Sequence, residues 1–264
     1  MDAETYERFT RRLLDRLAAD ERVLGLVALG SMAARDYVPD AWSDHDFFVI
    51  TRPGAQESLR TDLFWLPDAE RIAFHFRETA HGLKAIYADG HLVEFAVFDL
   101  AELNLAKINR YRTLLDRGGV EEALARVREA TKAWTAGSFE PDDHLLGQLL
   151  SNLLVGVGRH ARGERLSGGQ FVKSHALRHL LVLLERHLPA EGAEVLDDLD
   201  PLRRFERIYP ELGREIDALQ LAAVPTAARG LLEIARRELA GRLPGFPTAG
   251  VEAVAAGIRK AEAT

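Results

Sequence analysis

Two different spacings of apolar residues divide this 264-residue chain. In the first half, short apolar runs alternate with turn residues, a pattern that predicts buried strands with a few helices. From Val120 onward, apolar residues recur at helical spacing, and prolines or glycines stand at most of the expected helix ends. The pattern predicts an α/β domain, a mixed sheet with flanking helices, followed by an all-α domain. The pattern breaks near residues 135–141, so we expect domains of 1–138 and 139–264.

The first half contains runs typical of strands. Residues 44–51, DHDFFVIT, are rich in aromatic and β-branched side chains and predict a strand. Apolar positions over 4–19 recur on one helical face and predict a helix. The remaining expectations for this half are strands at 23–30, 71–76 and 111–116, a short helix over 31–36, and a helix over 99–108.

The clearest local signal is LKAIYA-DG-HLVEFAVF over residues 83–98. Asp89-Gly90 between two strand-like runs predicts a hairpin with a two-residue turn, in which both central residues have positive φ. The second half has no comparable signal. We expect it to consist of helices over 121–134, 142–162, 170–187, 201–221, 226–243 and 251–263.

Composition narrows the classes of function. The chain has no cysteine, which excludes disulfides and cysteine-ligated zinc and suits a reducing cytoplasm. Its charged N-terminus and lack of long apolar runs predict a cytoplasmic protein without a membrane partner. The 34 basic and 41 acidic residues give a net charge of −7 without a basic run. Binding of extended nucleic acid is therefore disfavoured, whereas a cationic acceptor would suit the acidic excess, which is also ordinary for soluble proteins.

Gly30 and Ser31 are the first candidate residues for a binding site. They stand between a predicted strand and a predicted helix, where a glycine lets a phosphate approach the backbone and the helix N-terminus offers unpaired N–H groups. The Ser31 hydroxyl adds a donor. The alternative is an ordinary turn, which a Gly-Ser pair after a strand usually forms.

Two carboxylates begin the next strand. Alternation along a strand places Asp44 and Asp46 on one face and His45 on the other. Such a pair suits Mg²⁺, which takes one or two protein carboxylates and completes its shell with water and phosphate oxygens. The alternative is a solvated strand edge.

A third acid, Glu94, lies in the second strand of the predicted hairpin between apolar residues. A carboxylate there is costly to bury unless it is paired or binds a metal, although a solvated sheet face would also accommodate it. We expect the neighbours in this hairpin to bring Glu94 beside Asp44 and Asp46, which would complete a triad of acids.

These features in this order resemble the DNA polymerase beta-like nucleotidyltransferases. LGS, YVPDAWSDHDFFVI and HLVEFAVF are most similar to the aminoglycoside and lincosamide adenylyltransferases, over roughly residues 20–120. The resemblance implies that Asp44 and Asp46 hold Mg²⁺ and that Glu94 is the general base. It also implies triphosphate contacts from Gly30, Ser31 and Ser43. His45 departs from the apolar residue that the family prefers.

The resemblance implies a magnesium-dependent enzyme of antibiotic resistance that moves AMP from ATP onto a hydroxyl of a small acceptor and releases pyrophosphate. Lys173, in the helical half, is a further candidate for the triphosphate, since lysine is a common phosphate ligand. We expect the helical half, over 142–187, to cover the active site and line the acceptor cleft.

Two alternatives differ in kind. The same catalytic core could attach nucleotides to a protein or RNA partner in a toxin–antitoxin setting, although this chain carries a large helical domain of its own. A non-catalytic nucleotide-binding module is the other, and the presence of all three acids argues against it.

Overall fold

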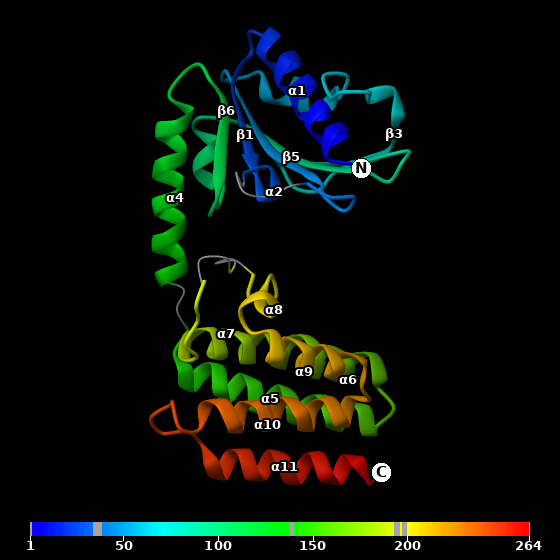
Figure 1. The fold of residues 1–264 in the computed structure, drawn as a ribbon, viewed down its shortest axis with the longest axis vertical. Coiled ribbons are helices and arrows are strands. Elements are labelled where there is room, and N and C mark those ends of the chain that lie inside the picture. Colours follow the sequence, from blue (N-terminus) through cyan, green and yellow to red (C-terminus); the bar gives the residue numbers. More distant parts are fainter. Residues whose placement is uncertain (1, 34–38, 138–139, 193–195, 197–199, 264) are drawn as a thin grey trace. The chain divides into compact units, whose positions relative to one another are not determined.

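The computed structural model describes residues 2–33, 39–137, 140–192, 196 and 200–263 (Figure 1). The chain divides into two compact units, Met1–Ala136 and Gly137–Thr264. The first unit contains a six-stranded sheet with helices, and the second is helical. The predicted fold class is therefore confirmed. No helix in the described part of the chain is long and apolar enough to span a membrane.

The sheet of the first unit is mixed. Its strand order is β3-β4-β5-β2-β1-β6, with β2 and β5 parallel and the other neighbours antiparallel. The strands are β1 (Val23–Leu29), β2 (His45–Thr51), β3 (Ile72–Arg77), β4 (Gly82–Tyr87), β5 (Leu92–Asp99) and β6 (Tyr111–Asp116).

Side chains of alternate residues build a separate core on each face of this sheet. One face packs against α1 (Ala3–Ala19) and includes Phe47 and Phe95, whose rings stack 5.5 Å apart. The other packs against α4 (Val120–Gly137) and includes Ile50 and Ala96. Burying a phenylalanine side chain stabilises a fold by roughly 1.5–3 kcal/mol, so the alternation pins the register of each strand.

Two local predictions for this unit are wrong. Residues 99–108 contain only a short 3₁₀ turn, Glu102–Leu105, because the Asp99 carboxylate accepts hydrogen bonds from the backbone of Ala101 and Glu102 and turns the chain. In the hairpin, Gly90 has φ +84° but Asp89 does not have positive φ. The connection spans residues 88–91, since β4 ends at Tyr87 and β5 begins at Leu92. The helices α2 (Gly30–Ala33) and α3 (Gln56–Thr61) complete the unit.

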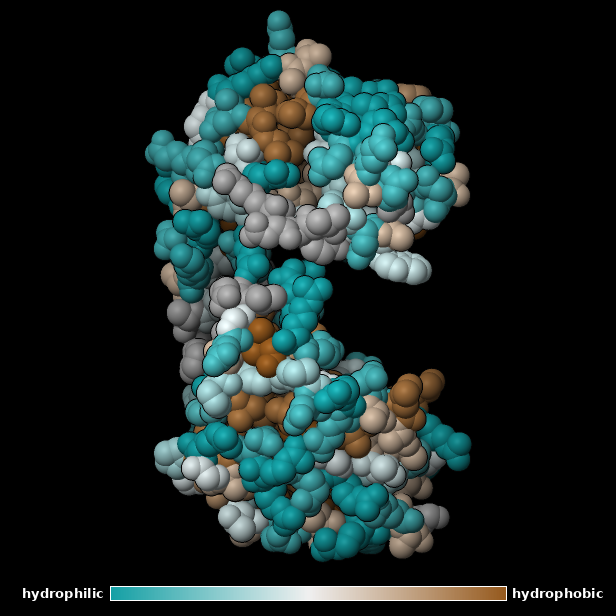
Figure 2. Space-filling view, viewed as in Figure 1, coloured by the Kyte–Doolittle hydropathy of each residue, from teal (hydrophilic) through white to brown (hydrophobic). Residues whose placement is uncertain are grey.

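The second unit has a core of its own, built from leucine, alanine and valine side chains. A predicted helix over 201–221 is interrupted at Tyr209-Pro210, because proline cannot continue the preceding helical hydrogen bonding. Its helices are α5 (Asp142–Ala161), α6 (Arg165–Gln170), a π-helical turn η3 (Phe171–Ala176), α7 (Leu177–His187), α8 (Phe205–Ile208), α9 (Pro210–Leu221), α10 (Val224–Leu239) and α11 (Thr248–Glu262). Figure 2 shows that the visible surface of each unit is mostly hydrophilic, with small apolar patches.

Candidate active site

The Gly-Ser turn lies against the start of β2. Gly30 has φ +48°, and a Cβ atom added to it would lie 3.4 Å from Asp46 Oδ2. The Ser31 hydroxyl donates to the Asp44 carbonyl at 3.4 Å, and the Tyr6 hydroxyl donates to the same oxygen at 2.9 Å. The absence of a side chain at Gly30 therefore leaves its backbone beside the Asp46 carboxylate.

His45 and Asp46 are consecutive residues of β2 and face opposite sides of the sheet, as predicted, whereas Asp44 precedes the strand. Asp44 and Asp46 are half-buried, and His45 is fully buried on the α1 face. The His45 ring stacks on Tyr6 with centroids 3.8 Å apart, and its nitrogens contact Thr10 Oγ1 at 3.0 Å and a His91 nitrogen at 2.8 Å. Burial, assisted by His91, lowers the pKa of His45 to about 3. His45 therefore packs as a neutral ring in place of the apolar residue that the family resemblance implies.

Glu94 is the register partner of Asp46. The parallel pairing of β2 with β5 matches these two residues, and adjacent strands lie about 4.8 Å apart. Both side chains are half-buried and project from the face opposite α1. The neighbour that brings Glu94 to the aspartates is thus β2 rather than the hairpin strand β4.

Lys84, which the sequence patterns did not single out, lies on the other side of Glu94. Its Nζ is 3.1 Å from Glu94 Oε2 and 3.0 Å from Glu78 Oε1. Lys84 and Glu94 are register partners in the β4–β5 hairpin. The predicted two-residue turn at Asp89-Gly90 would have paired Glu94 with Ala85, so the hairpin pattern alone would not have found the Lys84 contact.

The residues fit a magnesium ion that shares its shell with a nucleotide. Asp44 and Asp46 would offer two carboxylates, and Mg²⁺ usually takes one or two protein carboxylates at phosphate sites. Within the described ranges, no group of three or more His, Asp or Glu side chains could hold a metal by itself. The Glu94 carboxylate instead contacts Lys84. This arrangement favours a role for Glu94 other than third ligand.

Ser43 occupies the loop before β2. Its hydroxyl donates to Asp40 Oδ1 at 3.1 Å and accepts from the Asp40 backbone N–H at 2.9 Å. The side chain is 8% exposed, so these contacts shape the loop that leads to Asp44. A phosphate contact from Ser43 stays a prediction.

Lys173 has a structural role in the second unit. Its Nζ donates to the backbone carbonyls of Gln220 and Ala222, both at 2.6 Å. These carbonyls lie at the C-terminal end of α9, where a cation is favourable because of the helix dipole. The ammonium therefore holds the end of α9, and a triphosphate contact from Lys173 stays a prediction.

A pocket of about 580 Å³ opens beside Asp44. Trp42 is 92% exposed at its border, and acidic side chains dominate its charged lining. The lining comes from the start of α1, the loop before β2 and the β4–β5 connection; it consists of Asp2, Thr5, Ala41, Trp42, Ser43, Asp44, Asp89, Gly90, His91 and Leu92. Its size falls within the usual range for small-molecule sites.

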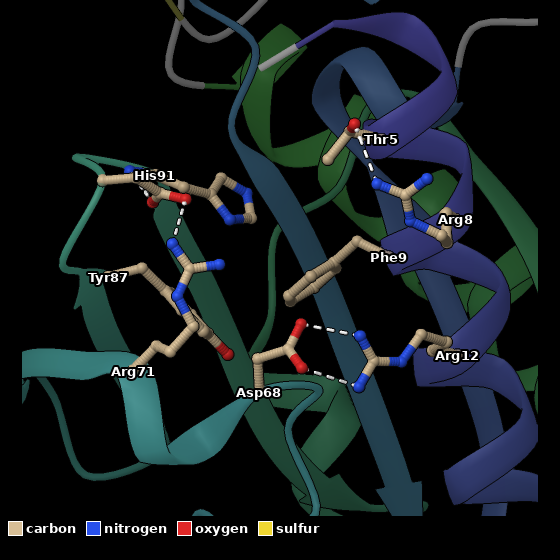
Figure 3. Close-up of a pocket in the computed structure, with 9 residues that line it drawn as sticks. Thr5, Arg8, Phe9, Arg12, Asp68, Arg71, Tyr87 and His91 are labelled. Atoms are coloured by element: carbon tan, nitrogen blue, oxygen red, sulfur yellow. Dashed lines mark hydrogen bonds and ion pairs between the residues drawn. The ribbon is translucent and has the colours of Figure 1, made fainter.

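A smaller pocket of about 160 Å³ lies between α1 and the end of β4 (Figure 3). Arginines line it, but they contact acids of the same unit: Arg12 donates two hydrogen bonds to Asp68 at 2.6 and 2.7 Å, and Arg71 donates to Asp89 at 3.1 Å. The Arg12 pair lowers the pKa of Asp68. These cations serve to hold the sheet connections together, so the pocket beside Asp44 is the better candidate for a ligand.

No protein-family model and no curated protein matches this chain. Chains of solved structures do match it, and two of them are as follows. An aminoglycoside 6-adenyltransferase from Bacillus subtilis is 12% identical over 97% of this chain and 98% of its own, with a TM-score of 0.34. The CD-NTase CdnG of Bradyrhizobium diazoefficiens, solved with GTP, is 16% identical over 97% of this chain and 91% of its own, with a TM-score of 0.27.

The residues of the candidate site follow one another in a definite order along the fold. A buried strand leads to the Gly30 turn, the next strand begins with Asp44 and Asp46, and a later strand places Glu94 beside them. This is the order that the resemblance to nucleotidyltransferases predicts, and a proposal for the activity has to follow from the site.

Proposed function

We propose that this chain transfers a nucleoside monophosphate, AMP from ATP, onto a hydroxyl group of a small acceptor. The observation that carries the proposal is the register pairing of Asp46 with Glu94 beside the Gly30 turn. The pairing joins a carboxylate suited to Mg²⁺, a carboxylate suited to act as a base, and a backbone turn that admits phosphate.

The residues of the site have separate roles in an in-line displacement at the α-phosphorus. The acceptor oxygen attacks the α-phosphorus, the bond to pyrophosphate breaks, and Glu94 accepts the hydroxyl proton. Gly30 and Ser31 hold the phosphates against the start of β2, and Asp44 and Asp46 hold the metal ion. Bound Mg²⁺ supplies neutralisation of phosphate charge.

The pocket beside Asp44, which Glu94 does not line, suits a cationic group of the acceptor away from the reacting hydroxyl better than it suits the triphosphate. Asp2, Asp44 and Asp89 contribute three carboxylates, and they would repel phosphates but attract a cationic acceptor. The exposed Trp42 ring offers a face for a cation or a sugar ring. An aminoglycoside or lincosamide antibiotic combines hydroxyl groups with amines, and modification of such a compound is the sharpest form of the proposal.

A screen tests the proposal directly. The purified chain is incubated with Mg²⁺, each of the four ribonucleoside triphosphates and a panel of aminoglycosides and lincosamides. Pyrophosphate release and the mass of the product are then measured. We expect release that depends on one acceptor class and disappears with chelator or in Asp46→Asn.

Other outcomes separate the alternatives. Transfer of radiolabelled nucleotide to a purified protein or RNA, with no small acceptor used, would support modification of a macromolecule. Nucleotide binding without pyrophosphate release by any combination would support the non-catalytic module. Either result would contradict the proposed reaction.

A further inference from the structure

Four strands contribute one cross-strand row of side chains to the face of the sheet opposite α1. The register runs from Phe76 on β3 through Lys84 and Glu94 to Asp46 on β2. Lys84 is the only cation in this row. Its side chain is 24% exposed and that of Glu94 is 33% exposed, so the pair is partly shielded from water.

Lys84 remains protonated in this environment. Its hydrogen bonds with Glu78 and Glu94 raise its pKa above the ordinary value. Lys84 is therefore a permanent hydrogen-bond donor rather than a base. A donor that holds one oxygen of a carboxylate limits the rotation of that carboxylate and leaves the second oxygen for a substrate hydroxyl.

Asp46 lies on the other side of Glu94, and its charge explains why the contact between Lys84 and Glu94 matters. Asp46 and Glu94 occupy matched positions on adjacent strands, and like charges directly opposite each other are unfavourable. The attraction of Lys84 opposes that repulsion and draws the Glu94 carboxylate away from Asp46. Asp46 can then serve the metal while Glu94 stays apart from it as a base.

We propose that Lys84 is a positioning residue of the transfer reaction, which acts by holding Glu94 in the orientation that accepts the acceptor proton. The inference rests on the proposed function, because it assigns a task within the same site. It also explains how two neighbouring carboxylates take different roles.

The test is a double-mutant cycle on turnover, with the triphosphate and the panel acceptor that the wild type uses best. Lys84→Met removes the donor, and we expect kcat to fall by about 10- to 100-fold, part of the 10²–10⁴-fold effect of a general base, with an unchanged KM for the nucleotide. Lys84→Arg keeps a donor and should recover most of the loss. In a Glu94→Gln background, Lys84→Met should lower kcat no further.

Glu78→Gln is the matched control, since it removes the other contact of Lys84 and leaves the Glu94 pair in place. We expect its kcat to stay within about twofold of wild type. Circular dichroism and thermal unfolding of every variant separate loss of structure from loss of turnover. Lys84→Leu, which also removes the donor, replaces Lys84→Met if the latter does not fold.

Three results overturn the inference. These are a kcat within about twofold of wild type for Lys84→Met, an equal loss of kcat in the Glu94→Gln background, and no recovery in Lys84→Arg. The first would make the ion pair an ordinary surface contact, which contributes little. Absence of turnover by the wild type with every triphosphate and acceptor would instead remove the proposed function, and this inference with it.

Discussion

At the scale of single residues, strand alternation at the start of β2 separates a residue of the core from a residue of the candidate site. His45 is a neutral ring in the core, whereas Asp44 and Asp46 remain half-buried, Asp46 on the opposite face. Carboxylates are costly to bury without partners, and partial exposure lowers that cost. Substitution of one of them should thus affect chemistry more than stability.

Asp46→Asn should abolish turnover and weaken Mg²⁺-dependent nucleotide binding, while thermal unfolding stays close to wild type. The amide keeps the shape of the side chain but loses the charge that a hard cation needs. Turnover and calorimetric nucleotide affinity, each with and without Mg²⁺, measure the effect. Asp15→Asn, an exposed acid on α1, is the control and should change neither value. Wild-type turnover by Asp46→Asn would remove the metal assignment.

Glu94→Gln separates a base from a metal ligand. If Glu94 accepts the proton, kcat should fall by about 10²–10⁴-fold with nucleotide affinity near that of wild type. Single-turnover kinetics and nucleotide titration measure the two quantities. A joint collapse of nucleotide and Mg²⁺ affinity would instead identify Glu94 as a third ligand.

At the scale of elements, the connection from β1 into α2 depends on the backbone of Gly30. Its φ of +48° lies in the left-handed region, which costs other residues roughly 1–2 kcal/mol. Gly30→Ala should therefore lower the free energy of unfolding by about 1 kcal/mol and also weaken nucleotide binding, because the turn beside Asp46 shifts.

Gly54→Ala is the matched control for that prediction. Gly54 has φ +87° in the turn after β2, and an added Cβ there meets nothing within 4 Å. The same kind of strain should reduce stability by a similar amount while nucleotide affinity stays unchanged. Denaturant unfolding and calorimetry compare the two variants, and equal losses of affinity would show that Gly30 has no special role at the phosphates.

The junction between β6 and α4 depends on a single carboxylate. Asp116 accepts hydrogen bonds from the backbone N–H groups of Gly118, Gly119, Val120 and Glu121 at 2.9–3.1 Å. These bonds, the one from Glu121 foremost, lower the pKa of Asp116. The carboxylate therefore stabilises the fold at pH values above its ordinary pKa of about 4, and this contribution is lost as the pH falls through the lowered folded value.

Asp116→Ala should lower the free energy of unfolding at pH 7 by about 1 kcal/mol, the usual effect of losing a helix cap. The difference between variant and wild type should shrink as the pH falls below 4. Urea unfolding at pH 7 and pH 3 measures both differences. A difference that does not change with pH would mean that the charge of Asp116 contributes nothing.

At the scale of the whole molecule, each of the two units has buried clusters of its own. The clusters on the two faces of the sheet belong to the first unit, and the leucine-rich cluster belongs to the second. A unit with its own core can fold alone. We propose that the helical unit contributes to acceptor binding, as the sequence led us to expect.

A fragment of residues 1–136 tests that division of labour. We expect it to fold, to retain Mg²⁺-dependent nucleotide binding, and to lose transfer to the acceptor. Circular dichroism, nucleotide titration and pyrophosphate release report these properties, with the full chain as the reference. Transfer at the full-length rate would instead make the helical unit an interaction domain.

Local patterns in the amino-acid sequence were sufficient to predict most of the strands, the change to helices, and the opposite faces of His45 and Asp46. A period of two along β2 is a property of adjacent residues, and it survives in any fold that buries one face of that strand. Predictions of turns and helices failed where a side chain competed for the hydrogen bonds of the backbone. Asp99 did so within the expected helix over 99–108.

Tertiary structure decided which of these residues meet. The pairing of Asp46 with Glu94 depends on β5 lying parallel to β2, and the two carbonyl contacts of Lys173 depend on the end of α9 reaching η3. Both join segments about 50 residues apart, so no local spacing encodes them. Such contacts form only when the burial of each core offsets the entropy of closing long loops.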